Sequence, residues 1–340
     1  MNNNYKKKIN RREKNIGIEI LRIYLSILVV NSHCYKISNN LIFIKILKNN
    51  LHVPTFFIIS FFFFKNSLVA RNLNKFKQRF QRLLIPYITW PIINWSINNI
   101  ITFFTNINLR KSIEDLKKLF LTGHCFNTVF WFQWNLIFET FIFIIVELIW
   151  HEYLIYILMN LVLSSYFLQY SNYNYRLFYK LDFSKRFTFG RFIEIIPFSI
   201  SIFILSYYQL INFLKDDKMK TIFICLFIFV IIFNYIIILE PKGFLYAGIK
   251  LNILSICLFI VFSLISFKFM NNFKMILQIS KFTPGIYYLH IPIMKYFINF
   301  ITTIKNKQLF GSFLIYLICY FICFIGSNIF KNSKLIYLFE

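Results

Sequence analysis

The sequence predicts an all-α polytopic membrane protein with about ten transmembrane helices, and three observations support this. Apolar residues make up 58% of the 340-residue chain and charged residues only 15%, whereas soluble domains average about 45–50% and about 25%. The apolar residues come in blocks of about 17 to 25, the length that crosses a hydrocarbon core of roughly 30 Å as a helix. The blocks lack the alternation of apolar and polar residues that a membrane β-barrel requires.

The first apolar block, at 16–34, directly follows a strongly basic amino-terminal arm at 1–15. No small-residue cleavage site follows it, so we expect an uncleaved helix with the arm in the cytoplasm. Further spans are expected at 51–68, 83–104, 129–149, 153–169, 192–213, 221–239, 249–269, 283–302 and 309–330. The chain then has a transmembrane domain at 16–330 and a tail at 331–340, with both termini on the cytoplasmic side of the cell membrane.

The net charge of +25 comes from 38 Lys and Arg against 13 Asp and Glu. In a soluble protein this charge would favour nucleic acid as a partner, but no nucleic-acid-binding motif is present. In a polytopic protein it favours cytoplasmic lysines and contact with anionic lipid. The basic loop at 170–191 is an exception, because the ten-helix topology places it on the opposite side.

Polar residues follow one face of the first predicted helix. Charges inside a span cost roughly 3 kcal/mol each, so they are functional candidates. Glu19, Arg22, Ser26 and His33 fall on one stripe, and Glu19 and Arg22 are spaced for an ion pair. Arg22 and His33 lie about 16 Å apart along the axis. The stripe is either a structural ion pair with a histidine at headgroup level or part of a transmembrane reaction site.

Two further clusters follow. His52, just before Pro54, either caps a helix or fills an interfacial site. The five cations within 71–82 either grip anionic lipid or hold the phosphates of a soluble donor. Arg79 and Arg82, three residues apart on a helix, are spaced to clamp a phosphate with two planar guanidinium groups.

Several ionisable residues in later predicted spans need a partner or an inward-facing cavity: Glu139, Glu147, Glu194 and His290. The aromatic run Phe130-Trp131-Phe132 is explained by an interfacial aromatic belt alone. No metal site is expected, because the five histidines are dispersed along the sequence.

Five short motifs occur in a fixed order: Glu19-x-x-Arg22-x10-His33, Val53-Pro54-x-Phe56-Phe57-x-x-Ser60, Arg79-x-x-Arg82 before Ile85-Pro86-Tyr87, Phe130-Trp131-Phe132, and Gly285-Ile286-Tyr287-x-x-His290. Their order and spacing resemble the signatures of acyltransferase family 3 over about residues 15–330. These are bacterial membrane O-acyltransferases that modify lipopolysaccharide, capsule, peptidoglycan and related polysaccharides of the cell envelope.

The resemblance implies O-acetylation or a related reaction, in which an acyl group passes from cytoplasmic acyl-CoA, such as acetyl-CoA, to a hydroxyl of a surface carbohydrate or lipid-linked glycan. It implies that His33 is the general base or acyl relay and that Arg22, oriented by Glu19, stabilises charge on the donor. Arg79 and Arg82 would hold the CoA phosphates. The acceptor or pore would be lined by His52, Ser60, Tyr287 and His290. Acyl-CoA is then a donor substrate, and no bound cofactor is implied.

The sequence departs from the family pattern at two places. Glu19 stands where the family commonly has Asp, and Phe61 follows Ser60 where the family commonly has Gly. Two alternatives to the enzyme stay open. One is a glycolipid carrier or flippase that binds headgroups with the same buried charges, and the other, suggested by the missing Gly, is a catalytically inactive family relative.

Overall fold

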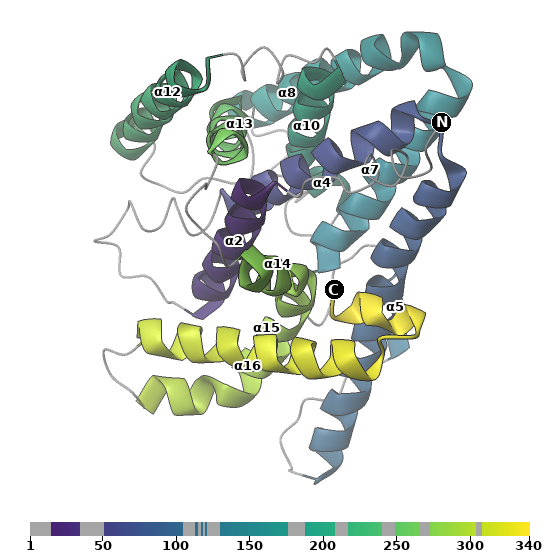
Figure 1. Cartoon of the computed structure of the whole chain (residues 1–340), viewed down its shortest axis with the longest axis vertical. Coiled ribbons are helices and arrows are strands. Elements are labelled where there is room, and N and C mark those ends of the chain that lie inside the picture. Colours follow the sequence, from purple (N-terminus) through teal and green to yellow (C-terminus); the bar gives the residue numbers. More distant parts are fainter. Residues whose placement is uncertain are drawn as a thin grey trace, which may run out of the picture.

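The computed structural model describes residues 15–34, 51–104, 130–175, 188–207, 217–239, 249–265, 273–303 and 308–340, together with 113, 114, 117 and 120. These residues are helical apart from short turns and contain no strand, which confirms the all-α prediction (Figure 1). The predicted basic arm lies outside the described residues except for Asn15, and so does the 176–187 part of the basic loop.

Each predicted apolar block contains one long helix. In chain order, these helices are α2 (Ile16–Cys34), α4 (His52–Val69), α5 (Leu73–Phe104), α7 (Phe130–Ile149), α8 (Leu154–Tyr175), α10 (Thr188–Tyr207), α12 (Lys218–Leu239), α13 (Ile249–Leu264), α15 (Thr283–Thr303) and α16 (Gln308–Ile329). Two short elements lie between long helices, η1 (His151–Tyr153) before α8 and α14 (Phe273–Lys281) before α15, and a third, η2 (Lys334–Leu338), follows α16.

Four of the described helices are long and apolar enough to cross a membrane: Ile16–His33, His52–Val69, Phe130–Ile149 and Gly311–Ile329. Many large apolar side chains also face outward, including Phe223 and Phe227 of α12, which are 65% and 66% exposed. Soluble proteins rarely expose so much apolar surface, whereas a surface that faces lipid is apolar. The protein is therefore a membrane protein, and the count of about ten spans remains a prediction.

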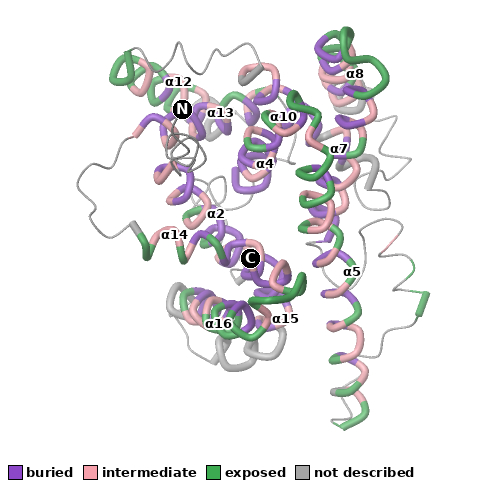
Figure 2. The backbone as a smooth tube through the Cα atoms, turned by 45° about the vertical axis from the view of Figure 1, so that its right-hand side comes forward, coloured by how far each residue is buried: buried purple, intermediate pink, exposed green. Residues whose placement is uncertain are grey.

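The buried centre of the described helices includes α10, which packs against α4 and α8 (Figure 2). Pro197 of α10 has no N–H, so the carbonyl of Ile193 lacks its helical partner. The side chain of Ser165 donates to this carbonyl, and Gln169 Nε2 donates to it at 2.9 Å. Both donors belong to α8, so the proline creates an acceptor that joins two helices.

The cationic segment is helical. Helix α5 begins at Leu73 rather than at the predicted 83. The side chain of Asn72 accepts from the Lys75 N–H at 3.1 Å, and Lys, Arg and Gln are good helix formers. Gln133 of α7 donates to the Leu83 carbonyl at 2.8 Å, just before Pro86. The carboxyl-terminal part of α5 projects away from the other described helices (Figure 2).

Candidate active site

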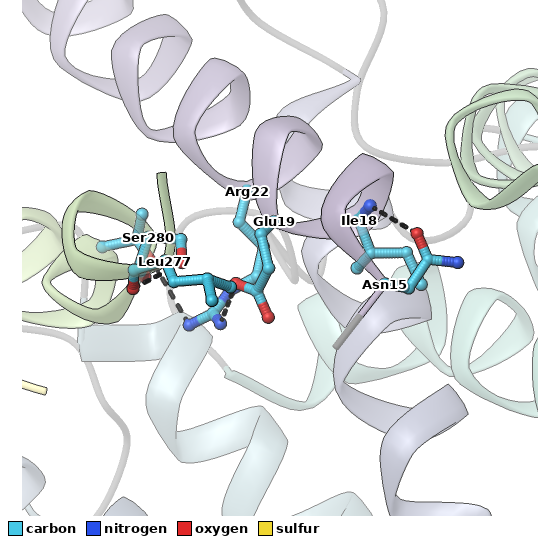
Figure 3. Close-up of polar contacts among 7 residues, drawn as sticks. Asn15, Ile18, Glu19, Arg22, Leu277 and Ser280 are labelled. Carbon is cyan, nitrogen blue, oxygen red and sulfur yellow. Dashed lines mark hydrogen bonds and ion pairs between the residues drawn. The ribbon is translucent and has the colours of Figure 1, made fainter. Parts of the chain in front are cut away.

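The polar face of α2 meets α15 and α16. Arg22 donates from Nη1 to Glu19 Oε2 at 2.9 Å, which is the ion pair that the spacing predicts. Its Nη2 donates to Thr283 Oγ1 at 3.2 Å, at the start of α15. Figure 3 shows Arg22 reaching toward α14, where Ser280 lies. The hydroxyl groups of Ser26 and Tyr316 are 3.2 Å apart, so the stripe also contacts α16.

His33, near the other end of α2, is paired with a second histidine. Its ring centroid lies 5.1 Å from that of His290 on α15. Nδ1 of His290 is 3.2 Å from the Ile286 carbonyl, and because a carbonyl only accepts, Nδ1 is assigned the proton. Nε2 of His290 is then an acceptor, and it is buried without a hydrogen-bond partner in the described part of the protein. His33 itself is exposed.

A third histidine lies close to this pair. His52 is the buried first residue of α4, whereas the N-cap position belongs to Leu51, so the capping interpretation is wrong. Both His33 and His52 are close enough to His290 to interact with it electrostatically. Histidines that are dispersed in the sequence therefore gather in the fold. Among the described residues, no group of three or more His, Cys, Asp or Glu could hold a metal ion.

Aromatic side chains surround the histidines on one side. The Tyr287 ring centroid lies 6.0 Å from that of His290 and 5.1 Å from that of Phe132. Phe132 in turn contacts Phe57 of α4, with centroids 4.7 Å apart. The aromatic run at the start of α7 is therefore part of the wall beside Tyr287, in addition to any role in an interfacial belt.

Arg79 is held between helices. It donates from Nε to Thr140 Oγ1 at 3.0 Å and from Nη2 to Ser60 Oγ at 3.0 Å, and its Nη1 reaches the Ser60 carbonyl at 3.3 Å. The guanidinium also lies over the rings of Phe61 and Phe64, 5.1 and 4.3 Å from their centroids. Ser60 therefore contacts Arg79 and anchors α5 to α4.

Arg82 has a different environment. Its side chain is exposed, and its guanidinium carbon lies 5.6 Å from the ring centroid of Tyr337 in η2. It makes no hydrogen bond with any residue that the structure describes. The two arginines are three residues apart, so they diverge by about 60° around the helix. The structure does not bring Arg79 and Arg82 together as a two-pronged clamp.

The buried carboxylates have partners. Glu139 accepts a hydrogen bond from the Ser199 hydroxyl and interacts electrostatically with Arg79. Glu147 accepts from Arg71 Nε at 3.2 Å and lies 2.6 Å from His151 Nδ1. These contacts explain why α7 tolerates two acids. The side chain of Glu194, the remaining candidate, lies outside the described residues.

The predicted tail at 331–340 is docked. Leu338 and Phe339 are buried, and Trp90 Nε1 donates to the Leu338 carbonyl at 3.2 Å. Lys281 and Glu340 form an ion pair. Sequence reasoning missed these contacts, and the only available signal was the apolar run around Tyr337, which is too short for a span.

Comparison with known proteins agrees with this arrangement. A family model described as an acyltransferase domain, that of acyltransferase family 3, matches residues 15–331. This region includes the α2 stripe, all three gathered histidines and both α5 arginines. No curated protein and no solved structure is significantly similar to the chain. Because the match covers nearly the whole chain, the protein belongs to acyltransferase family 3 and is a membrane acyltransferase.

Proposed function

We propose that the protein is an O-acyltransferase that moves an acyl group, acetyl in the simplest case, from acyl-CoA to a hydroxyl of a surface carbohydrate or lipid-linked glycan. The observation that carries this proposal is the approach of His33 to His290, with ring centroids 5.1 Å apart. The accessible imidazole of His33 thus lies beside Nε2 of His290, a buried hydrogen-bond acceptor. His33 is on the same helix, α2, as the Glu19–Arg22 ion pair.

The reaction needs a base and a path for one proton. Imidazole titrates near neutral pH, so His33 can take the proton of the acceptor hydroxyl. The hydroxyl oxygen then attacks the thioester carbonyl, the carbon–sulfur bond breaks, and the departing CoA thiolate receives the proton. Nε2 of His290 can accept a hydrogen bond from His33 and so stabilise its protonated form.

The donor would extend along α2 and α15. These helices run parallel, because Arg22 contacts Thr283 at one end and His33 contacts His290 further along. Arg22 and His33 are separated by about 16 Å along the helix axis. Arg22 is therefore too far from the thioester carbonyl beside His33 to stabilise it, and it binds negative charge elsewhere on the donor. The extended pantetheine arm of CoA bridges such a distance. His52 and Tyr287 then line the acceptor side.

The two α5 arginines would have separate roles. Arg79 is already bonded to Ser60 and Thr140, so it positions the helix. Arg82 is exposed and has free donors among the described residues, so it binds a CoA phosphate. We place this end of the molecule in the cytoplasm, where acyl-CoA and anionic lipid headgroups are available.

The test uses the purified full chain in lipid nanodiscs with radiolabelled acetyl-CoA and an extracted glycan or glycolipid fraction. We expect His33→Ala to lower transfer by at least about 100-fold, the usual contribution of a general base, at an unchanged amount of folded protein. His52→Ala should lower it less. His151→Ala is the matched control, because the one ion pair of His151 within the described residues is with Glu147 at the end of α7.

Two results would contradict the proposal. Wild-type transfer by His33→Ala would remove the catalytic assignment. Absence of acyl-CoA turnover by the wild-type protein, together with glycolipid movement across the bilayer, would support the carrier instead.

A further inference from the structure

The segment that carries η2 is fixed to the body of the protein, and it lies beyond residue 331, where the family match ends. Phe339 stacks on Phe330, with centroids 5.8 Å apart and planes inclined by 8°, and meets Trp90 edge to face at 6.1 Å. A Cβ added to Gly326 would lie 2.4 Å from the Phe339 ring. The fit is therefore close, and it depends on the absence of a side chain at Gly326.

This docking orients the face of η2. The Ser333 hydroxyl accepts from the Leu335 N–H at 3.2 Å and caps the element. Residues three apart eclipse one another in a 3₁₀ helix, so Lys334 and Tyr337 share one face. The Tyr337 ring lies 5.6 Å from the Arg82 guanidinium. Two chain segments far apart in sequence thus present two cations and an aromatic ring together.

The positive charge on this face is not neutralised. Arg82 and Lys334 are exposed and form no ion pair with any acid in the described residues. Glu340, the acid nearest in sequence to Tyr337, is paired with Lys281. Lys75 is also exposed and lies seven residues before Arg82 on α5, on nearly the same face and about 10 Å away along the axis.

We infer that the surface formed by Arg82, Lys334 and Tyr337 binds the adenine nucleotide part of acyl-CoA. One face of the Tyr337 ring is covered by Arg82, and the other stacks on the adenine. Arg82 and Lys334 contact phosphate groups, and Lys75 reaches a further phosphate along α5. The inference rests on the proposed function, which supplies the donor, and it adds η2 to the donor site.

Adenosine 3′,5′-bisphosphate is the probe, since it carries the nucleotide without the thioester. Its binding to the full chain is measured by calorimetry in nanodiscs of zwitterionic lipid. We expect Tyr337→Ala to weaken binding by about 5- to 100-fold, the usual effect of losing a base-stacking ring. Tyr337→Phe should bind as the wild type does. Lys220→Ala is the matched cation control, because Lys220 is exposed at the start of α12.

A second readout separates loss of the site from loss of the fold. In transfer assays, Tyr337→Ala should raise KM for acetyl-CoA but leave KM for acetyl-phosphopantetheine unchanged, because the shorter donor lacks adenine. A rise for both donors would show that the variant disturbs the fold rather than an adenine site. This result, or unchanged bisphosphate affinity, would overturn the inference.

The remaining outcomes are also decisive. If the bisphosphate does not bind, but phosphatidylglycerol vesicles retain the wild type more strongly than Arg82→Ala, the surface is a lipid-headgroup site and the inference is wrong. If the bisphosphate binds through Tyr337 but the protein turns over no acyl-CoA, the proposed function fails while the nucleotide site stands.

Discussion

Replacing Arg79 by Lys should destabilise the protein although the charge is kept. Arg79 makes three hydrogen bonds, to Thr140 and twice to Ser60, and an ammonium group lacks the planar geometry to keep more than one. In water-soluble proteins each such bond is worth about 1.5–3 kcal/mol. Between transmembrane helices the measured average is only about 0.6 kcal/mol and the maximum about 1.7, so losing two costs about 1–3 kcal/mol.

The assay is reversible unfolding in mixed detergent micelles, with Arg82→Lys as the matched control. Arg82 has no described hydrogen bond to lose, so its variant should unfold as the wild type does. Arg79→Met should cost more than Arg79→Lys, because it removes all three hydrogen bonds and the charge that interacts with Glu139. Adding Glu139→Gln to that variant should restore part of the loss. Equal stability of Arg79→Lys and the wild type would refute the reasoning.

Two other predictions concern the ends of helices. Gly326→Val should displace Phe339, because a Cβ at this position would already lie 2.4 Å from the Phe339 ring. Limited proteolysis should then cleave the chain after Lys331 or Lys334. An unchanged cleavage pattern would mean that the carboxyl-terminal segment docks without this close fit. Arg71→Gln should lower stability, because the buried Glu147 then loses the arginine that donates to it at 3.2 Å. An unfolding transition like that of the wild type would contradict a stabilising role for this contact.

The periodicity of the sequence is enough to predict features within one helix. The length of each apolar block predicts a helix, and the spacing of Glu19 and Arg22 predicts their ion pair. The helical periodicity also puts His33 on the same face as Glu19 and Arg22, but it cannot show that His290 is the neighbour of His33. That contact depends on how α2 and α15 pack, and the two residues are far apart in sequence.

The divergence of Arg79 and Arg82 has the same cause. Residues three apart on a helix point about 60° apart, so the neighbouring helices decide whether both face one ligand. Here α4 and α7 supply Ser60 and Thr140 to one arginine only. The docked end was missed for a related reason. Its acceptor surface is made by Gly285 and Gly326, whose missing side chains give no signal in hydropathy.

The contacts between helix ends can be compared with the predicted topology, in which successive spans cross the membrane in opposite directions. With the amino terminus inside, alternation places the end of α4 and the end of α7 on the same side, and Arg71 contacts Glu147 there. It also places the start of α15 beside the end of the chain, where Lys281 and Glu340 pair.

On the opposite side, alternation places the end of α8 beside the start of α10, and Gln169 donates to the Ile193 carbonyl there. The ten-span topology, which stays a prediction, therefore assigns the Arg71 contact and the Gln169 contact to opposite sides of the membrane. The basic loop at 170–191 joins α8 to α10, so we predict that it lies on the side away from the Arg82 surface, where a positively charged loop can approach an anionic glycan. Labelling a single Cys at position 172 with an impermeant reagent in intact cells, in a variant without the native cysteines, tests this placement.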